Sequence, residues 1–308
     1  MALLVTAFFG NSADWRRLFA EQMPELDVRV WPEVGNPDDI DVAAVAAVPH
    51  GRLKSFRNLR MIVSLLAGAD ILLSDPDLPD VPLVRAGNPD GDEMMNEAAL
   101  LHVLRHHRHL PAYHLAQQRA EWISLPRLRA SQRSVGVLGL GTIGLAVAKT
   151  LAAHGFKVAG WVRTARPMNG IDMFAGREQW PASLARSEIA VNLLPLTTQT
   201  RGILDAEAFG QLPKGAAIIN LGRGAHLVEA DLIAALDRDH LAAATLDVFP
   251  VEPLPKDSAL WRHPKITVTP HAARRIDVAD LVPRICDSIQ ALNAGRPLGH
   301  LIDRARGY

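Results

Sequence analysis

Apolar runs of strand length alternate with amphipathic stretches of helix length along most of the chain. This alternation is typical of an α/β protein built on parallel sheets. In the first hundred residues the apolar runs predict strands at 3–8, 42–48, 61–65 and 82–84. A second series is predicted at 134–138, 157–162, 189–194, 216–221, 243–248 and 265–268, with helices at 143–154 and 229–238. The second series is sufficient for a complete doubly wound domain.

The stretch from Ile276 to Ala294 predicts one further helix, because apolar residues recur there at steps of 4, 3, 4 and 3 residues. Such steps place the apolar residues on one helical face, although Pro283 should bend the helix or leave a carbonyl unpaired. We expect this helix to return to the N-terminal domain. The predicted organisation is therefore a discontinuous substrate domain, 1–101 plus 276–308, around a dinucleotide-binding domain at 102–275.

The composition narrows the class of protein. Hydrophobic residues make up 48% of the 308 residues, which is enough for a sizeable core. The 33 Lys and Arg balance the 33 Asp and Glu, which argues against nucleic acid as the main partner. No apolar run is long enough to predict a membrane span. Because Cys286 is the only cysteine, no disulfide framework is expected, and we predict a cytoplasmic protein.

A glycine motif, Gly139-Leu140-Gly141-Thr142-Ile143-Gly144, directly follows a predicted strand and opens a predicted helix. In that context the first glycine permits a tight turn, the second lets a pyrophosphate approach the backbone, and the third lets helix and strand pack closely. The helix N-terminus supplies N–H groups for the phosphates. The motif therefore predicts a dinucleotide site that includes Thr142 and Ile143.

The end of the next predicted strand bears on the choice of dinucleotide. It reads Gly160-Trp161-Val162-Arg163-Thr164-Ala165-Arg166, with Val162 about where an enzyme that uses NAD places an acid. Two arginines and a hydroxyl can bind a 2′-phosphate through charge-assisted hydrogen bonds. The sequence thus favours NADP (NADPH), with NAD possible. The alternative, that these arginines only belong to a solvated loop, stays open.

Three further predicted strand ends carry polar residues: Arg223 in Asn220–Gly224, Asp247 and Glu252 in Leu246–Leu254, and His271 after Thr267–Pro270. In an open α/β sheet, ligands bind outside the carboxyl ends of the strands. A histidine can give a proton to the oxygen of a reduced ketone, and a carboxylate beside it favours the imidazolium. An arginine can bind a substrate carboxylate. Together they predict reduction of a small 2-keto acid, with Arg223, Glu252 and His271 catalytic.

These segments together resemble the D-isomer-specific 2-hydroxyacid dehydrogenases, and within them the glyoxylate/hydroxypyruvate reductase branch. The resemblance covers nearly the whole chain and includes Asn192–Thr197 and Trp261–His271. It implies a Rossmann-type cofactor domain inserted in a flavodoxin-like substrate domain, a cleft that closes on the cofactor, and a homodimer. The product implied is the D-2-hydroxy acid.

The resemblance also implies individual roles. Arg223 matches the substrate-binding arginine, Glu252 the acid that tunes the histidine, His271 the proton donor, and Asp247 the residue that faces the nicotinamide amide. Ala67 and Gly68 match the backbone N–H pair that receives the substrate carboxylate. The remaining expected cofactor contacts are Trp161, Leu194, Pro195, Leu196, Thr200, Leu221, Gly222, His271 and Ala273.

Some features depart from the family or remain open. Leu66 stands where the family often has glycine, and Arg274 and Arg275, just after His271, either touch substrate or point to solvent. His102 and His106 have a spacing that can bind a metal, but no clear third ligand accompanies them, so no metal site is predicted. A helix is predicted over 92–110, and this helix, which carries both histidines, is implied to form the dimer arm, with Trp122 placed to reach the partner subunit. The alternative function is a non-catalytic protein that senses dinucleotide on the same fold.

Overall fold

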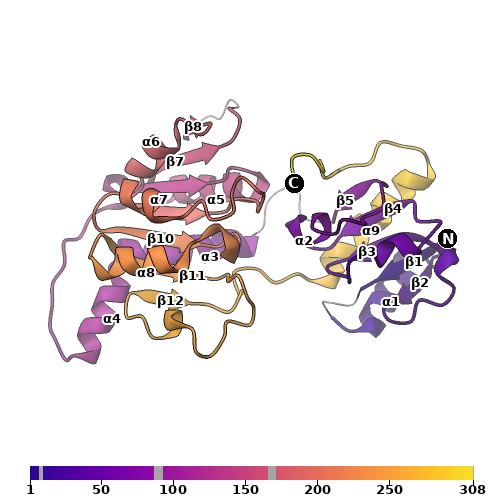
Figure 1. Cartoon of the computed structure of the whole chain (residues 1–308), viewed down its shortest axis with the longest axis horizontal. Coiled ribbons are helices and arrows are strands. Elements are labelled where there is room, and N and C mark those ends of the chain that lie inside the picture. The colour runs from indigo at the N-terminus through magenta and orange to yellow at the C-terminus, as the bar shows by residue number, and fades with distance from the viewer. Residues whose placement is uncertain (7–9, 87–92, 166–170, 308) are drawn as a thin grey trace. The chain divides into compact units, whose positions relative to one another are not determined.

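The computed structural model describes residues 1–6, 10–86, 93–165 and 171–307 (Figure 1). The chain divides into two compact units. The first comprises residues 1–89 with 276–308, and the second comprises residues 90–275. The predicted boundary between residues 101 and 102 falls inside a helix of the second unit, Glu93–His107.

The first unit is built on a five-stranded sheet in the order β2-β1-β3-β4-β5, in which every neighbouring pair is parallel. The strands are β1 (Ala2–Val5), β2 (Asp27–Val30), β3 (Ile40–Val45), β4 (Met61–Ser64) and β5 (Leu83–Arg85). Its helices are α1 (Ser12–Gln22), α2 (Asp70–Leu73) and α9 (Val278–Asn293), with short 3-10 turns at Pro37–Asp39 and Leu53–Ser55. This strand order is that of the flavodoxin-like fold, as expected.

Helix α9 brings the C-terminal segment into the first unit. It packs against α1, and Ile285 and Ile289 share a buried core cluster with Trp15 and Phe19 of α1. The helix begins at the side-chain cap of Asp277 and continues through Pro283. The apolar face read from the sequence is therefore the buried face.

The second unit contains a seven-stranded sheet in the order β8-β7-β6-β9-β10-β11-β12, again parallel throughout. The strands are β6 (Ser134–Leu138), β7 (Lys157–Val162), β8 (Asp172–Ala175), β9 (Ile189–Asn192), β10 (Ala216–Asn220), β11 (Leu241–Leu246) and β12 (Ile266–Val268). Counted from β6, the order is the Rossmann order with one strand added beyond the sixth. The order reverses between β6 and β9, which is where such sheets bind ligands.

Helices cover both faces of this sheet. One buried cluster contains residues of α3 (Glu93–His107) and α5 (Thr142–Ala153), and another contains residues of α6 (Trp180–Ala185), α7 (Ala206–Gln211) and α8 (Glu229–Asp237). Helix α4 (Leu110–Gln118) extends from the end of α3, and 3-10 turns lie at Ala130–Gln132, Gly224–His226 and Ala259–Trp261. The expected pair of doubly wound parallel-sheet domains is confirmed.

The structure differs from the predicted elements mainly at the sheet edges and in short helices. Strands β2 and β8, and helices α1, α6 and α7, were not predicted. The helix expected over 92–110 ends at His107, because His109 adopts a left-handed conformation (φ 58°), and the helix that follows it, α4, was not predicted. Across the described ranges, no helix is long and apolar enough to cross a membrane.

Candidate active site

The glycine turn after β6 has the three properties that a pyrophosphate cradle requires. Gly139 has φ 96°, and a Cβ on Gly144 would lie 1.8 Å from the carbonyl oxygen of Gly139. A Cβ on Gly141, in contrast, would meet nothing within 4 Å. Gly141 caps α5, whose first N–H groups, from Thr142 and Ile143 onward, have no partner within the helix. The turn therefore leaves open backbone where phosphate oxygens would bind, and these residues fit a dinucleotide.

The turn after β7 presents Arg163 and Thr164 on the surface, next to the buried Val162. Trp161, expected as a cofactor contact, is buried and donates from Nε1 to the carbonyl oxygen of Gly176 at 2.9 Å. Its indole thus ties β7 to the turn after β8. Arg166 lies outside the described residues.

The turn after β9 is closed by Thr200. Its hydroxyl donates to the carbonyl oxygen of Pro195 at 2.7 Å and accepts from the N–H of Thr197 at 2.8 Å. Leu194 is buried, whereas Pro195 and Leu196 are half-buried. Thr200 therefore shapes this turn from within, and its expected contact with a cofactor stays a prediction.

Arg223 lies in the turn after β10. The turn begins at the buried Leu221 and Gly222, and the Arg223 guanidinium donates to the carbonyl oxygen of Gly222 at 2.9 Å. A Cβ on Gly224 would lie 1.9 Å from the carbonyl carbon of Phe249, so only glycine fits there. The Arg223 turn is consequently pressed against the segment that follows β11.

Glu252 and His271 form a hydrogen-bonded pair beyond the ends of β11 and β12. Nδ1 of His271 lies 2.7 Å from Oε2 of Glu252, while Oε1 of Glu252 accepts from the N–H of Phe249 at 2.9 Å. The carboxylate is thus fixed by the backbone, and its hydrogen bond places a proton on Nδ1. The His271 side chain is 51% exposed, which leaves Nε2 as the ring nitrogen that can face a substrate.

Asp247 has a role that the sequence did not reveal. It is buried, and Oδ1 accepts from the hydroxyl of Thr269 at 2.6 Å and the N–H of Ala272 at 2.8 Å. Oδ2 accepts from the N–H of Ala273 at 3.0 Å. The carboxylate therefore holds the loop around His271, whose own φ of 52° is unusual for a residue with a side chain. The expected contacts of Asp247 and Ala273 with nicotinamide stay predictions.

In the first unit, Ala67 and Gly68 follow β4 and are half-buried. The hydroxyl of Ser64, the last residue of β4, donates to the carbonyl oxygen of Leu66 at 3.2 Å and so fixes the start of this loop. The expected binding of a substrate carboxylate by the Ala67 and Gly68 N–H groups stays a prediction.

The histidines of α3 are packed inside the second unit. His102, His106 and His107 are buried, and Nε2 of His106 lies 2.9 Å from the hydroxyl of Thr245 on β11. Burial lowers the pKa of His106 to about 3, so its imidazole is neutral near pH 7. Among the residues that the structure describes, no group of three or more His, Cys, Asp or Glu side chains is arranged to hold a metal ion.

Comparison with known proteins identifies the family. Residues 100–273 match the NAD binding domain of the D-isomer specific 2-hydroxyacid dehydrogenases. The chain is 40% identical, over 306 residues and 97% of each protein, to glyoxylate/hydroxypyruvate reductase A of Serratia proteamaculans. The chain belongs to the D-isomer specific 2-hydroxyacid dehydrogenase family.

Solved structures of this family agree with the fold. A D-isomer specific 2-hydroxyacid dehydrogenase of Xanthobacter autotrophicus, in complex with NADPH and MES, has a TM-score of 0.95 and 42% identity, covering 100% of this chain and 99% of that one. An NADPH-dependent glyoxylate/hydroxypyruvate reductase of Sinorhizobium meliloti, in complex with NADP and sulfate, has a TM-score of 0.91 and 35% identity, with coverage of 100% and 99%.

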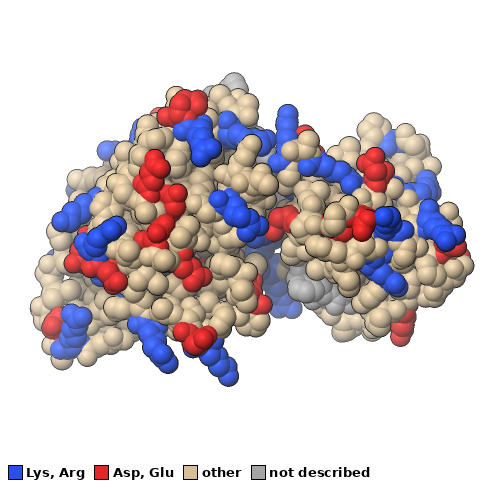
Figure 2. Space-filling model, in the orientation of Figure 1, with Lys and Arg blue, Asp and Glu red and all other residues tan. Residues whose placement is uncertain are grey.

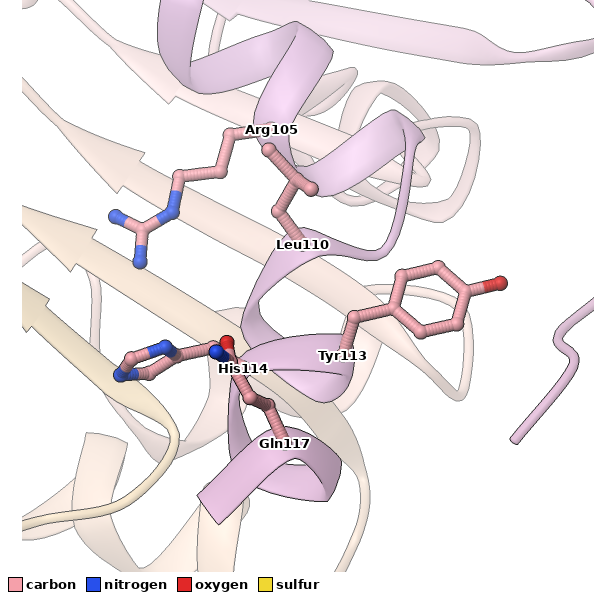
Figure 3. Close-up of a pocket in the computed structure, with 5 residues that line it drawn as sticks. All are labelled: Arg105, Leu110, Tyr113, His114 and Gln117. Carbon is pink, nitrogen blue, oxygen red and sulfur yellow. The ribbon is translucent and has the colours of Figure 1, made fainter. Parts of the chain in front are cut away.

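A hollow on the surface of the second unit belongs to a different region from these turns. It is lined by side chains of α3 and α4 (Figure 3), namely Arg105, Leu110, Tyr113, His114 and Gln117. On the face seen in Figure 2, basic and acidic side chains are interspersed. This mixture matches the balanced charge of the sequence and is unlike the basic face of a nucleic-acid binder.

Proposed function

We propose that this chain is a reductase that transfers a hydride from NADPH to a short 2-keto acid of the glyoxylate or hydroxypyruvate type and yields the D-2-hydroxy acid. The observation that carries this proposal is the 2.7 Å hydrogen bond between His271 and Glu252, at strand ends of the same sheet that bears the glycine cradle. The names of the relatives from Serratia and Sinorhizobium support the same substrate class.

The chemistry assigns one task to each side chain. When bound, NADPH supplies a hydride to the keto carbon. His271 gives the proton from Nε2 to the keto oxygen, so that the carbonyl becomes a hydroxyl with charge balanced. Glu252 holds Nδ1 and stabilises the imidazolium that precedes the transfer. Arg223 binds the carboxylate of the substrate and polarises the neighbouring carbonyl.

The substrate assignment is tested by steady-state kinetics with glyoxylate, hydroxypyruvate, pyruvate and phenylpyruvate, each with NADPH and NADH. We expect glyoxylate and hydroxypyruvate to have the highest kcat/KM of the four acids. For hydroxypyruvate, chiral analysis of the product should give the D isomer. Binding of NADPH without turnover of any of the four acids at millimolar concentration would instead favour a dinucleotide-sensing protein.

The preference for NADPH rests on the turn after β7. Arg163 and Thr164 are exposed there, and Val162 occupies the position of the acid that binds a ribose 2′-hydroxyl. Arg163→Ala should lower the ratio of kcat/KM for NADPH over NADH by about 10-fold, since a charge-assisted hydrogen bond contributes about 1.5–3 kcal/mol. Arg238→Ala, an exposed arginine at the end of α8, is the matched control. An unchanged ratio in Arg163→Ala would place the preference elsewhere.

We also propose a homodimer, and a cytoplasmic location on the ground of the single cysteine. The homodimer is supported by large apolar side chains exposed on α3, on α4 and just beyond α4: Leu101 is 62% exposed, Leu110 52%, and Trp122 fully. Exposed apolar groups that gather on one region mark an interaction surface. One of these side chains, Leu110, also lines the hollow in Figure 3.

Sedimentation velocity tests the dimer. The wild-type chain should sediment as a dimer, and Leu101→Glu should shift it toward monomer because the substitution buries an unpaired charge at the contact. Val251→Glu, at a site 62% exposed after β11, controls for added charge. A wild-type chain that is monomeric at about 50 µM would contradict the proposal. A dissociation constant of that size corresponds to roughly 6 kcal/mol of association free energy.

A further inference from the structure

Three polar side chains lie fully buried beneath the Arg223 turn: Asn192 at the end of β9, Asn220 at the end of β10, and His226 in the 3-10 turn that follows Arg223. Burial of a polar group costs free energy unless the group is hydrogen-bonded. Such a cluster among the apolar strands of a core therefore requires specific partners, and each of the three residues has hydrogen-bond partners, which for the ring of His226 lie at Nδ1.

The orientation of both amides is set by the backbone. Oδ1 of Asn192 accepts from the N–H of Leu194 at 3.2 Å, so Nδ2 is the donor, to Oδ1 of Asn220 at 2.8 Å and to Nδ1 of His226 at 2.9 Å. Oδ1 of Asn220 also accepts from the N–H of Gly222 at 3.2 Å, and its Nδ2 donates to the carbonyl oxygen of Arg223 at 3.1 Å. No other assignment of oxygen and nitrogen satisfies these backbone groups.

The protonation of His226 follows from the same contacts. Its Nδ1 accepts from the N–H of Arg223 at 3.1 Å and from Nδ2 of Asn192 at 2.9 Å. Two donors converge on one ring nitrogen, so that nitrogen carries no proton. The imidazole is the neutral form with its proton on Nε2.

The cluster supports the Arg223 turn through packing as well. A Cβ on Gly222 would lie 3.0 Å from Nδ2 of Asn192 and 3.1 Å from Nδ1 of His226, so the turn rests directly on these atoms. On its other side, Gly224 is pressed against the backbone of Phe249, whose N–H binds Glu252. The turn is thus held between the buried cluster and the segment that carries the proton-transfer pair.

We propose that Asn192, Asn220 and His226 are positioning residues that hold both the N–H and the carbonyl oxygen of Arg223 and so fix its guanidinium for a substrate carboxylate. This assignment rests on the proposed function. Asn192 has a second consequence. Because it binds the N–H of Leu194, it joins the turn after β9, expected to lie beside the cofactor, to the turn that binds substrate. The ring of His226 bonds the substrate turn, through the N–H of Arg223, and the amide of Asn192.

The first test compares two substitutions of His226. His226→Leu leaves the Arg223 N–H and one of the two N–H groups of the Asn192 amide without an acceptor. KM for the keto acid should rise by about 10-fold or more, with NADPH affinity changed by less than about 3-fold. His226→Asn places an amide oxygen near the position of Nδ1 and should recover most of that loss. His240→Leu is the matched control, since the ring of His240 also bonds backbone groups, in its case the carbonyl oxygens of Phe209 and Leu212, away from the site. It should lower Tm and leave KM unchanged.

The second test uses Asn192→Asp. The new carboxylate can still accept from Leu194, but its other oxygen faces Oδ1 of Asn220, so both turns should be disturbed. We expect weaker NADPH binding by fluorescence titration together with a raised KM for the keto acid. A change in KM alone would overturn the coupling of the two turns, and unchanged values for both constants would overturn the positioning role.

Two measurements on the wild-type chain need no turnover. Long-range ¹H–¹⁵N correlation spectra should show His226 protonated on Nε2 and not on Nδ1, and hydrogen exchange should show a protected Arg223 amide. A proton on Nδ1 would overturn the assignment. If the wild-type chain reduces none of the keto acids, the proposed function fails while these two observations still decide whether the cluster holds the turn.

Discussion

The two halves of the second sheet hold their carboxyl-end turns by opposite means. In the half formed by β6, β7 and β8, the principal turn is made of glycines, and the space around Gly141 is open. In the half formed by β9 to β12, the turns are tied down by buried polar side chains, namely Asn192, Asn220, His226 and Asp247. The glycine turn of the first half presents bare backbone, and the second half presents side chains on a rigid support.

The difference follows from what each half has to bind. A pyrophosphate is recognised by N–H groups that already point in one direction, so any Cβ in the way only weakens binding. Proton transfer and carboxylate binding need His271 and Arg223, whose freely rotating side chains act only when their orientation is fixed. Backbone hydrogen bonds from Glu252 and Asn220 provide that fixation.

The largest effect on kcat/KM is expected at the side chain that transfers the proton. His271→Gln keeps a polar group near Nε2 but removes the acid, so kcat/KM for the keto acid should fall by about 10²–10⁴-fold. Glu252→Gln keeps the bond from Phe249 and loses the charge beside His271, and should cost about 10–100-fold. Both are measured by steady-state kinetics at saturating NADPH.

A control separates chemistry from binding in these variants. NADPH affinity by fluorescence titration should stay within about 3-fold of wild type (about 0.6 kcal/mol), because neither side chain belongs to the glycine cradle. If His271→Gln retained nearly full kcat/KM, His271 would not be the proton donor.

The glycines of the cradle should separate stability from cofactor binding. Gly141→Ala adds a methyl group to open space, so the free energy of unfolding should change by less than about 0.5 kcal/mol, while Kd for NADPH rises about 10-fold. Gly144→Ala drives a methyl group into the Gly139 carbonyl oxygen and should destabilise the protein by about 1–3 kcal/mol. Thermal unfolding and fluorescence titration measure the two effects. Equal losses of stability in both variants would contradict the division of roles among the glycines.

The sequence was sufficient for the features that depend on local pattern. The β6 strand, the glycine motif and α5 follow one another without interruption, so a short window contains all of the information. The same is true of α9, whose apolar steps mark the face that is buried. The pairing of Glu252 with His271 was expected from chemistry and the order of strand ends, and the two side chains do meet.

What the sequence could not reveal depends on contacts between distant segments. Asn192 and His226 are 34 residues apart, and nothing in the local pattern around either residue indicates that their side chains meet. Asp247 was identified, but its three donors come from a loop whose path only the fold defines. The edge strands β2 and β8 contain polar residues and only four residues each, so their apolar pattern is too weak to distinguish them from loops.

The smallest expected effect concerns the packing of helix α3 on the half of the sheet formed by β9 to β12. Helix α3 packs on β9 and β10, and His106 reaches Thr245 of β11. Because the folded pKa of about 3 lies below that of an unfolded histidine, the unfolded chain binds more protons between these values. The free energy of unfolding is therefore unaffected by the protonation of His106 above about pH 6.5, and it decreases as the pH falls below that value. Lowering pH from 7.5 to 5.5 should therefore cost about 1 kcal/mol through His106.

His106→Gln tests this contribution, because its amide can still bond the Thr245 hydroxyl but does not titrate. In urea unfolding at the two pH values, the variant should lose about 1 kcal/mol less stability than wild type. His114→Gln, at an exposed position of α4, is the control and should follow wild type. Identical pH dependence in His106→Gln and wild type would mean that His106 is not held neutral behind β11. Behind β6, helix α5 packs through apolar residues such as Val147 and Leu151. Without a neutral, buried His106 behind β11, the two halves of the sheet would differ only in the turns at their carboxyl ends.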